Sequence, residues 1–600
     1  MMERFDTNTG LLAGILLLLG TGGLCGCAAS SDAAGFEGGT AAGGSDTDTG
    51  AASASDGDTA DGESETNGGF ETDGTIPPPE EEEEADFRVP KASGRFVYSA
   101  SELTDSVAVI DSSNLSIDVV GVGRGPTVVA PLAANGPMQG AVAVLDQGSD
   151  DVAILSTDQT GASSVEIIDA TPGANNLVVS PDGRFLVVHV DVDGPEEIGP
   201  GSDQEITVID VTSNAVYPMT VGAHPREIAF SSDSSRAFVV TADGVNVIDF
   251  AQIDMIGIPD IIPAYTDPGI DPDTLEVQVA ADLAIALARV DGRKTLVATD
   301  LLTREQQVFE LDAVPTDLDI APDASFAVLT VPRAAGSQIV ELPLPLGTSA
   351  LQSHVISQEY VGLAALSPTA DTLLLYTTQN PFEGGVPPDD EGTTTTGVDP
   401  TGDTDTDTDT DTGGGTTTGS EPEPNPDAVP THRDPRLRLT VARRDGSGWD
   451  TSITLFVDRP IKSVGIAPDG ASGMLLHQPT ADSIPYAYTL LDLEKEFPVK
   501  KLQTVQATPE PVLFTPDGAR SVVLLRDDAL GVKRVDQVDL HTFIVDGFDL
   551  GSPPEGTGYV DATDKIFVSQ DHPTGRITFI DAASGVETVT GYRLNDAVKD

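Results

Sequence analysis

Seven histidines and two cysteines are the residues of this chain best suited to bind a transition metal or to act as nucleophiles. The histidines stand singly, without the close spacings that build metal sites, at His189, His224, His354, His432, His477, His541 and His572. The sequence contains no Gly-x-Ser-x-Gly elbow, no His-Glu-x-x-His motif and no phosphate-binding glycine loop. We therefore expect no metal, no cofactor and no catalytic residue.

Alternating aspartates between Asp403 and Thr412 raise the question of calcium binding. An EF-hand loop needs a glycine at its sixth position to bend the chain and a glutamate at its twelfth to chelate the ion. Counted from Asp403, these positions hold Thr408 and Gly414, so the motif fails. Weak counterion binding to a solvated acidic tract is the favoured interpretation.

The two cysteines, Cys25 and Cys27, both lie close to the N-terminus. The rest of the chain therefore has no thiol, which excludes disulfides, Cys-ligated zinc, iron–sulfur clusters and Cys nucleophiles there. An apolar run over 11–19 followed by small residues is typical of a secretory signal peptide, and the run is too short to span a bilayer. We predict a signal peptide over 1–26.

The stretch Leu24-Cys25-Gly26-Cys27 resembles the lipobox of bacterial lipoproteins. The resemblance implies that Cys27 is lipidated and becomes the mature N-terminus, so that the lipid makes the membrane a partner. Ala28 follows where an Asp would imply retention in the inner membrane, and the resemblance therefore favours the outer membrane. The alternative is an ordinary cleaved signal with an incidental cysteine.

Negative charge is concentrated in two tracts of a chain whose formal net charge is -66. Residues 28–86 contain eight Asp and nine Glu, residues 381–430 contain nine Asp and four Glu, and neither tract has a Lys or Arg. Such compositions cannot bury enough apolar surface to offset chain entropy, so we predict a disordered tether over 27–86 and a disordered insertion over 381–430. No basic footprint for nucleic acid exists, and we expect no nucleic-acid partner.

From residue 87 onward, short apolar runs are separated by turns that recur about every 40 to 50 residues. Pro-Asp-Gly turns lie at 180–183, 467–470 and 515–518, with looser versions near 93, 132, 233, 282, 323, 369 and 563. A second signature, an apolar pair followed by Asp, ends at Asp111, Asp169, Asp210, Asp249, Asp492 and Asp581. The Asp side chain accepts hydrogen bonds from nearby backbone N–H groups. Both motifs are therefore predicted to form hairpin turns, and their aspartates are not predicted to be catalytic acids.

Each unit is predicted to hold four antiparallel strands, which is the blade of a β-propeller. We predict an all-β propeller of about seven to ten blades over 87–380 and 431–600, in one large ring or two smaller ones unless divergent units are over-counted. The repeats resemble the YVTN family, best at 176–210 and 227–249. The resemblance implies the propeller fold, and similar propellers include lactonases and quinone-dependent dehydrogenases.

Two long connections, 191–204 and 381–430, are predicted to join second strands to third strands and so to project from one face of the ring. Variable loops on a rigid scaffold are common binding sites. We predict the recognition surface on that face, whose acidic character suits cationic partners or divalent ions. Trp449, the only tryptophan, is either an exposed ligand anchor or a packing aromatic.

These features favour a cell-envelope lipoprotein whose propeller binds a protein, glycan or cell-wall partner. An enzyme of lactonase-like or quinone-dehydrogenase-like type is the less favoured alternative. It would carry carboxylates and a histidine with shifted protonation at the channel mouth. A passive spacer would show no coherent pocket or patch.

Overall fold

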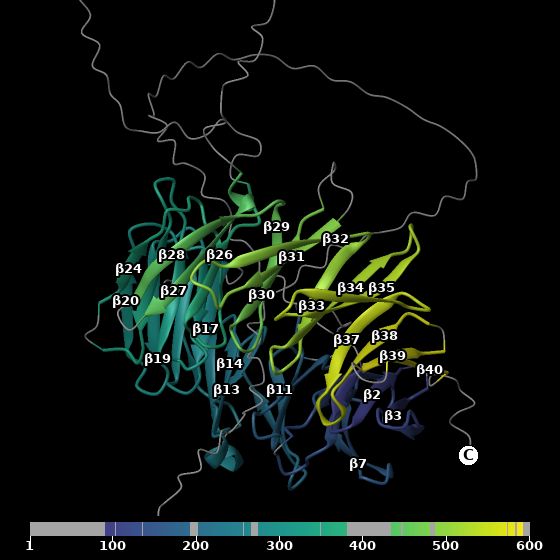
Figure 1. Ribbon diagram of the computed structural model, residues 1–600. Helices are drawn as coiled ribbons and strands as arrows, with labels where there is room; N and C mark the ends of the chain where they lie inside the picture. The colour runs from purple at the N-terminus through teal and green to yellow at the C-terminus, as the bar shows by residue number, and fades with distance from the viewer. Residues whose placement is uncertain are drawn as a thin grey trace, which may run out of the picture.

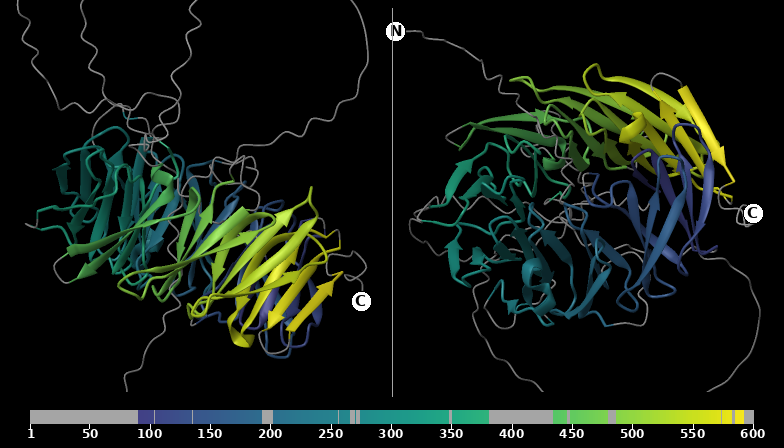
Figure 2. Two further views of the ribbon diagram at one scale, coloured as in Figure 1. Left: turned by 45° about the horizontal axis from the view of Figure 1, so that its top comes forward. Right: turned by 90° about the horizontal axis from the view of Figure 1, so that it is seen from below.

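Ten four-stranded antiparallel sheets make up the fold, and each is formed by four strands that are consecutive in the chain. The computed structural model describes residues 90–591, apart from 103, 135, 193–201, 256, 266–269, 271–273, 348–349, 381–433, 446–447, 480–485, 573 and 582–584. The sheets stand side by side around a ring (Figure 1; Figure 2). The predicted all-β propeller is confirmed, with ten blades.

Blades are numbered in chain order. Within each blade the first strand lies nearest the centre of the ring and the fourth lies at its rim. Blades 1 to 5 comprise β1 (Lys91–Ser93), β2 (Phe96–Ser101), β3 (Ser106–Asp111), β4 (Ile117–Gly121); β5 (Pro126–Pro131), β6 (Ala141–Asp146), β7 (Asp151–Thr157), β8 (Ser163–Asp169); β9 (Asn176–Val179), β10 (Phe185–His189), β11 (Glu205–Asp210), β12 (Ala215–Thr220); β13 (Glu227–Phe230), β14 (Arg236–Thr241), β15 (Gly244–Asp249), β16 (Ile261–Ile262); and β17 (Leu275–Ala280), β18 (Ile285–Val290), β19 (Thr295–Asp300), β20 (Gln306–Glu310).

Blades 6 to 10 comprise β21 (Asp317–Ile320), β22 (Phe326–Val331), β23 (Gln338–Pro343), β24 (Gln352–Val355); β25 (Leu363–Leu366), β26 (Thr372–Tyr376), β27 (Arg438–Asp445), β28 (Gly448–Phe456); β29 (Ile461–Ile466), β30 (Ser472–His477), β31 (Tyr486–Asp492), β32 (Val499–Val505); β33 (Thr508–Phe514), β34 (Arg520–Asp527), β35 (Val532–Asp539), β36 (Ile544–Asp549); and β37 (Pro554–Val560), β38 (Lys565–Gln570), β39 (Arg576–Asp581), β40 (Gly585–Thr590). Short 3-10 helices are η1 (Phe250–Met255), η3 (Pro435–Leu437) and η4 (Asp561–Thr563).

Burial explains why second strands are apolar throughout rather than alternating. Each blade is covered on both faces by its neighbours, so every residue of β6 and of β18 is buried. The fourth strands lie at the rim, and four of the five residues of β20 are exposed. The sequence signal is therefore strongest in the middle of each blade.

Ten clusters of buried apolar side chains hold the ring together, and each joins two neighbouring blades. The cluster that closes the ring packs Val97 and Ile110 of blade 1 against Phe567 and Phe579 of blade 10. No strand is exchanged between the first and last blades, because every blade is one continuous segment. Closure therefore depends on side-chain packing, and the first blade (purple) and the last blade (yellow) lie side by side in Figure 2.

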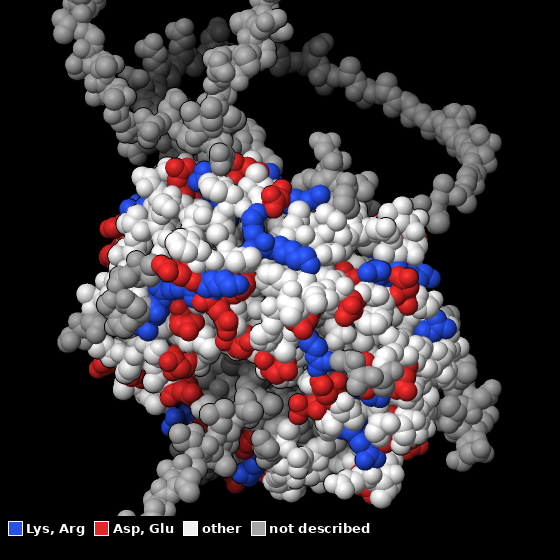
Figure 3. Space-filling view, viewed as in Figure 1, with Lys and Arg blue, Asp and Glu red and all other residues white. Residues whose placement is uncertain are grey.

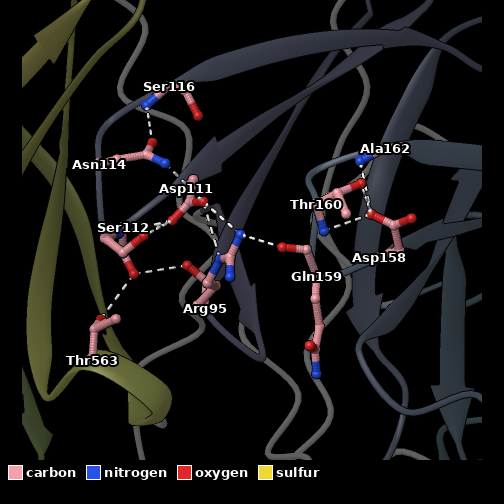
Figure 4. Close-up of polar contacts among 11 residues, drawn as sticks. Arg95, Asp111, Ser112, Asn114, Ser116, Asp158, Gln159, Thr160, Ala162 and Thr563 are labelled. Carbon is pink, nitrogen blue, oxygen red and sulfur yellow. Dashed lines mark hydrogen bonds and ion pairs between the residues drawn. The ribbon is translucent and has the colours of Figure 1, made fainter.

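Polar contacts reinforce this closing seam (Figure 4). The Ser112 hydroxyl lies 2.8 Å from that of Thr563 in blade 10, and Lys565 Nζ donates to the Ser112 carbonyl (2.9 Å). On the other side of blade 1, Arg95 donates to Asp111 (3.0 Å) and to the Gln159 carbonyl of blade 2 (2.9 Å). Three blades are thus linked by hydrogen bonds at the seam.

The predicted turns are confirmed at all ten first hairpins, and the Pro-Asp-Gly copies show why they recur. Asp182 Oδ1 accepts from the Ser180 hydroxyl (2.7 Å) and from the Arg184 N–H (3.0 Å), while Gly183 adopts φ 69°. Five of the six apolar-pair aspartates end third strands as expected. The prediction was wrong for Asp169, which ends the fourth strand β8, because the third strand of blade 2, β7, ends at Thr157 without this motif.

The two faces of the ring differ in their connections. We call the face with the first-to-second and third-to-fourth turns the tight-turn face, and the face with the second-to-third and fourth-to-first connections the long-loop face. The connections after β10 and after β26 both lead to third strands, so both belong to the long-loop face as predicted.

Candidate functional site

Four consecutive blades carry a polar residue at one position of the innermost strand: Asn176, Glu227, Glu276 and Asp317. Each stands six residues before the central position of its blade's first turn, at 182, 233, 282 and 323. Each also pairs with the second-strand residue thirteen positions later, respectively His189, Val240, Arg289 and Thr330. Because first strands begin at the long-loop face, these four residues, the polar arc, lie at that end of the central channel.

Arg289, the strand partner of Glu276, places a positive charge at the polar arc. Its buried guanidinium forms ion pairs with Glu276 and with Asp291, whose Oδ1 lies 2.9 Å from Nη1. Gln278 donates to Glu276 Oε1 (3.3 Å) and to the Leu318 carbonyl of the next blade. Burial raises the pKa of Glu276 above its ordinary value, and Arg289 offsets this only in part. Two carboxylates share one buried cation.

Asp317 adds a third carboxylate to this part of the arc. It is buried and accepts hydrogen bonds from the backbone N–H of Ala364 in blade 7 (2.6 Å) and of Leu318 (3.0 Å). Burial and the nearby charge of Glu276 nevertheless raise the pKa of Asp317 to about 7. The carboxyl links two blades, and it is short of positive charge.

Sequence reasoning missed Glu276, Arg289 and Asp317. A signal was present, since an acidic residue precedes the turn by six positions in three consecutive units. The electrostatic repulsion between Glu276 and Asp317 depends on how neighbouring blades pack, however, and these residues lie in different repeats of the sequence. The repeat period alone does not predict that these side chains are close in space.

One histidine, His189, lies beside the polar arc as the strand partner of Asn176. His189, at the arc's level in blade 3, is buried, and burial lowers its pKa. Burial also lowers the pKa of His477 to about 4, although its ring contacts the Pro460 carbonyl (3.2 Å) and the Thr489 hydroxyl (2.7 Å). His224 is exposed beside Asp203, whereas His432 lies outside the described residues. Within the described part of the chain, no three His, Cys, Asp or Glu side chains gather as metal ligands.

Trp449 is a packing aromatic rather than an exposed anchor. Its side chain is 4% exposed and meets Phe326 of the neighbouring blade edge to face, with ring centroids 6.0 Å apart. Both residues belong to the apolar cluster between blades 6 and 7.

The rim does not share the chain's acidic excess uniformly. In the view of Figure 3, Lys and Arg side chains lie among Asp and Glu. One ion pair there joins Lys500 of the fourth strand β32 to Asp458 (2.8 Å). This one-to-one pair differs from the arc, where Glu276 and Asp291 share Arg289.

Several predictions fall on residues outside the described part of the chain. These are the signal peptide over 1–26, lipidated Cys27, the tether over 27–86 and the insertion over 381–430. Among the described residues, no helix has the length and apolar character to cross a membrane.

No family model matches the chain, and no curated protein does. Solved structures that resemble it include a eukaryotic initiation factor, with 12% identity over 83% of this chain and 97% of that one and a TM-score of 0.42. Another is the dihydro-heme d1 dehydrogenase NirN in complex with DHE, with 12% identity over 68% of this chain and 75% of that one and a TM-score of 0.37. The Dos1 propeller has 13% identity over 72% of this chain and 90% of that one and a TM-score of 0.33. These likenesses concern the fold alone.

Proposed function

We propose that the propeller is a binding module whose long-loop face recognises a protein partner carrying ammonium or guanidinium groups. The observation that carries the proposal is the shortage of positive charge around Glu276, Asp291 and Asp317, which share Arg289 as their buried cation. The ten apolar clusters make the scaffold rigid, and the charged residues at the mouth of the channel would contact the partner.

A bound cation would offset the burial of Glu276 and Asp317 and the repulsion between them. A raised pKa means that the charged form is disfavoured in the free protein, and an opposite charge nearby restores it. Binding at slightly acidic pH should therefore release protons, because Asp317 has a pKa raised to about 7. Proton release distinguishes this site from the solvated acidic tracts, whose carboxylates are expected to be ionised already.

The test is the affinity of the full chain for a fluorescent Lys/Arg-rich peptide, measured by anisotropy and, for proton release, by calorimetry in two buffers. E276Q combined with D317N should weaken binding by about tenfold, since two favourable charge contacts are removed. E305Q is the matched control, because Glu305 is exposed on the tight-turn face of the same blade. Equal affinity of all three proteins, or binding without proton release, would contradict the proposal.

An enzymatic role is the second candidate, and one specific observation favours it. A carboxyl with its pKa near 7, as raised in Asp317, has the protonation behaviour of a general acid or base. The described contacts of Asp317 include no histidine or nucleophilic side chain. Turnover of a panel of lactones that D317N abolishes, and E305Q does not, would support this role over binding.

The cell-envelope location is also part of the proposal, supported by the lipobox-like stretch ending at Cys27. An outer-membrane lipid anchor would hold the propeller at a surface on the tether over 27–86. Metabolic labelling with a fatty acid should mark the wild-type chain and not the Cys27→Ser variant. Labelling of both would refute Cys27 as the lipidated residue.

A further inference from the structure

A second carboxylate pair lies on the long-loop face, in blade 2. Asp146 ends β6 and Asp151 begins β7, and the two are directly opposite each other in the hairpin. Asp146 is fully buried and Asp151 is 9% exposed. Like charges facing each other across a hairpin are destabilising unless a proton or a cation lies between them.

Each carboxylate has one oxygen without a donor. Asp146 Oδ2 accepts a hydrogen bond from the Gly123 N–H (3.0 Å). The other oxygen, Oδ1, is buried without a hydrogen-bond partner among the described residues, and so is Asp151 Oδ1. Orphaned buried oxygens of this kind point to a missing ligand.

The surroundings of Gly123 show how closely the polar atoms converge. A Cβ at Gly123 would overlap Asp151 Oδ1 and Ser149 Oγ, and would approach Asp146 Cβ to 2.7 Å. Ser149 Oγ accepts from the Arg124 N–H (2.8 Å) and retains a second lone pair. Two carboxylates and a hydroxyl therefore surround a position that tolerates no side chain.

Blade 4 shows that this hairpin does not require a carboxylate pair, because Thr241 and Gly244 face each other there as Asp146 and Asp151 do in blade 2. There, the Gly222 N–H donates to the amide oxygen of Asn246 (3.1 Å), the same type of contact that Gly123 makes with Asp146. A neutral amide thus satisfies the backbone donor. The charges of Asp146 and Asp151 remain without a structural explanation.

We propose that Asp146, Asp151 and Ser149 bind a hard divalent cation of the Ca²⁺ type. The donors are oxygens only, two negative charges match the charge of the ion, and a hairpin adapts to the irregular coordination that Ca²⁺ accepts. Water and backbone carbonyls would complete the shell. This site is separate from the polar arc, and its occupancy does not depend on the proposed partner.

The test compares thermal unfolding of the chelator-treated full chain with and without Ca²⁺ or Mg²⁺ for wild type, D146N, D151N and D243N. D146N keeps an amide oxygen for the Gly123 N–H, as Asn246 does for Gly222. D243N is the matched control, because Asp243 is exposed and caps the Ala223 N–H (2.9 Å) in blade 4. Calorimetry gives the stoichiometry.

Saturating Ca²⁺ should raise the midpoint of wild type and D243N by about 2 to 4 °C, and Mg²⁺ by less. D146N and D151N should not respond and should lose one equivalent of tight binding. If D146N fails to fold, D151N decides, since Asp151 does not contact the Gly123 N–H. The absence of a wild-type shift, an equal shift in D151N, or a larger shift with Mg²⁺ would overturn the proposal.

Discussion

Carboxyl groups on the two faces of the ring are shifted in opposite directions. On the tight-turn face the pKa is lowered for Asp111, Asp158, Asp210, Asp233, Asp323, Asp371, Asp517 and Asp539. On the long-loop face the pKa is raised for Asp146, Glu276 and Asp317. The residue types are the same, so the difference lies in their surroundings.

Hydrogen-bond donors account for the difference. Burial would raise the pKa of Asp210, but Arg184 (2.7 Å) and both the N–H (3.0 Å) and hydroxyl (2.6 Å) of Thr212 outweigh it and lower the value to about 2. Around Asp317 and Glu276, burial prevails over the available donors. Donors around Asp210 stabilise its charged form, whereas the donors around Asp317 and Glu276 do not offset burial.

The largest expected effect concerns the close packing on the long-loop face. Gly123→Ala should lower the free energy of unfolding by about 3 kcal/mol, because its Cβ would overlap Asp151 and Ser149. Gly121→Ala is the control, since a Cβ there meets nothing within 4 Å. Denaturant unfolding measures both. Equal stability of the two variants would mean that the carboxylate pair is not tightly held.

A smaller effect is expected on the tight-turn face. Asp210→Ala should cost about 2 kcal/mol, because it removes the bonds from Thr212 and Arg184. Asp169→Ala is a control of similar sequence, because Asp169 follows an apolar pair as Asp210 does but is exposed at the end of a rim strand. The free energy of unfolding of the Asp169→Ala variant should stay within about 0.5 kcal/mol of the wild-type value. Similar losses in both variants would show that the motif, rather than its place in the blade, determines stability.

A smaller effect still is expected in the pH dependence of stability, which should have opposite signs for the carboxyls of the two faces. Asp317 has a pKa raised to about 7, so the folded state keeps a proton that the unfolded state loses from about pH 4 upward, and stability should fall as pH rises through this window. D317N should reduce that slope by on the order of 1 kcal/mol per pH unit. Asp210 has a lowered pKa of about 2 and acts in reverse, with stability lost only as pH falls below about 4. Urea midpoints across pH measure both slopes, and an unchanged slope in D317N would contradict the account.

The sequence predicts the blades well because each is local. Asp182 and Gly183 determine a turn through their own backbone and their nearest neighbours, and the apolar runs beside them must be buried. The number of blades follows from counting turns, but their arrangement in a single ring does not. Closure depends on contacts such as Val97 with Phe567, between opposite ends of the described chain.

The candidate sites are less predictable for the same physical reason. Glu276 and Asp317 interact across two blades, so their repulsion follows from ring geometry rather than from any local pattern. Asp146 and Asp151 lie close in sequence, yet only burial distinguishes them from the many solvated aspartates of this acidic chain. The loops indicate the long-loop face as the predicted recognition surface, which is also the face of the proposed sites, but no local pattern indicates the carboxylates themselves.

The opposite protonation of the two faces can be measured directly by infrared spectroscopy of carboxyl groups at about pH 6, where an ordinary Asp is ionised. Wild type should show a neutral carboxyl band that D317N diminishes and D210N leaves unchanged, because Asp317 has a pKa raised to about 7 and Asp210 one lowered to about 2. Absence of the band in wild type, or its equal loss in both variants, would contradict the division between a structural face and a binding face.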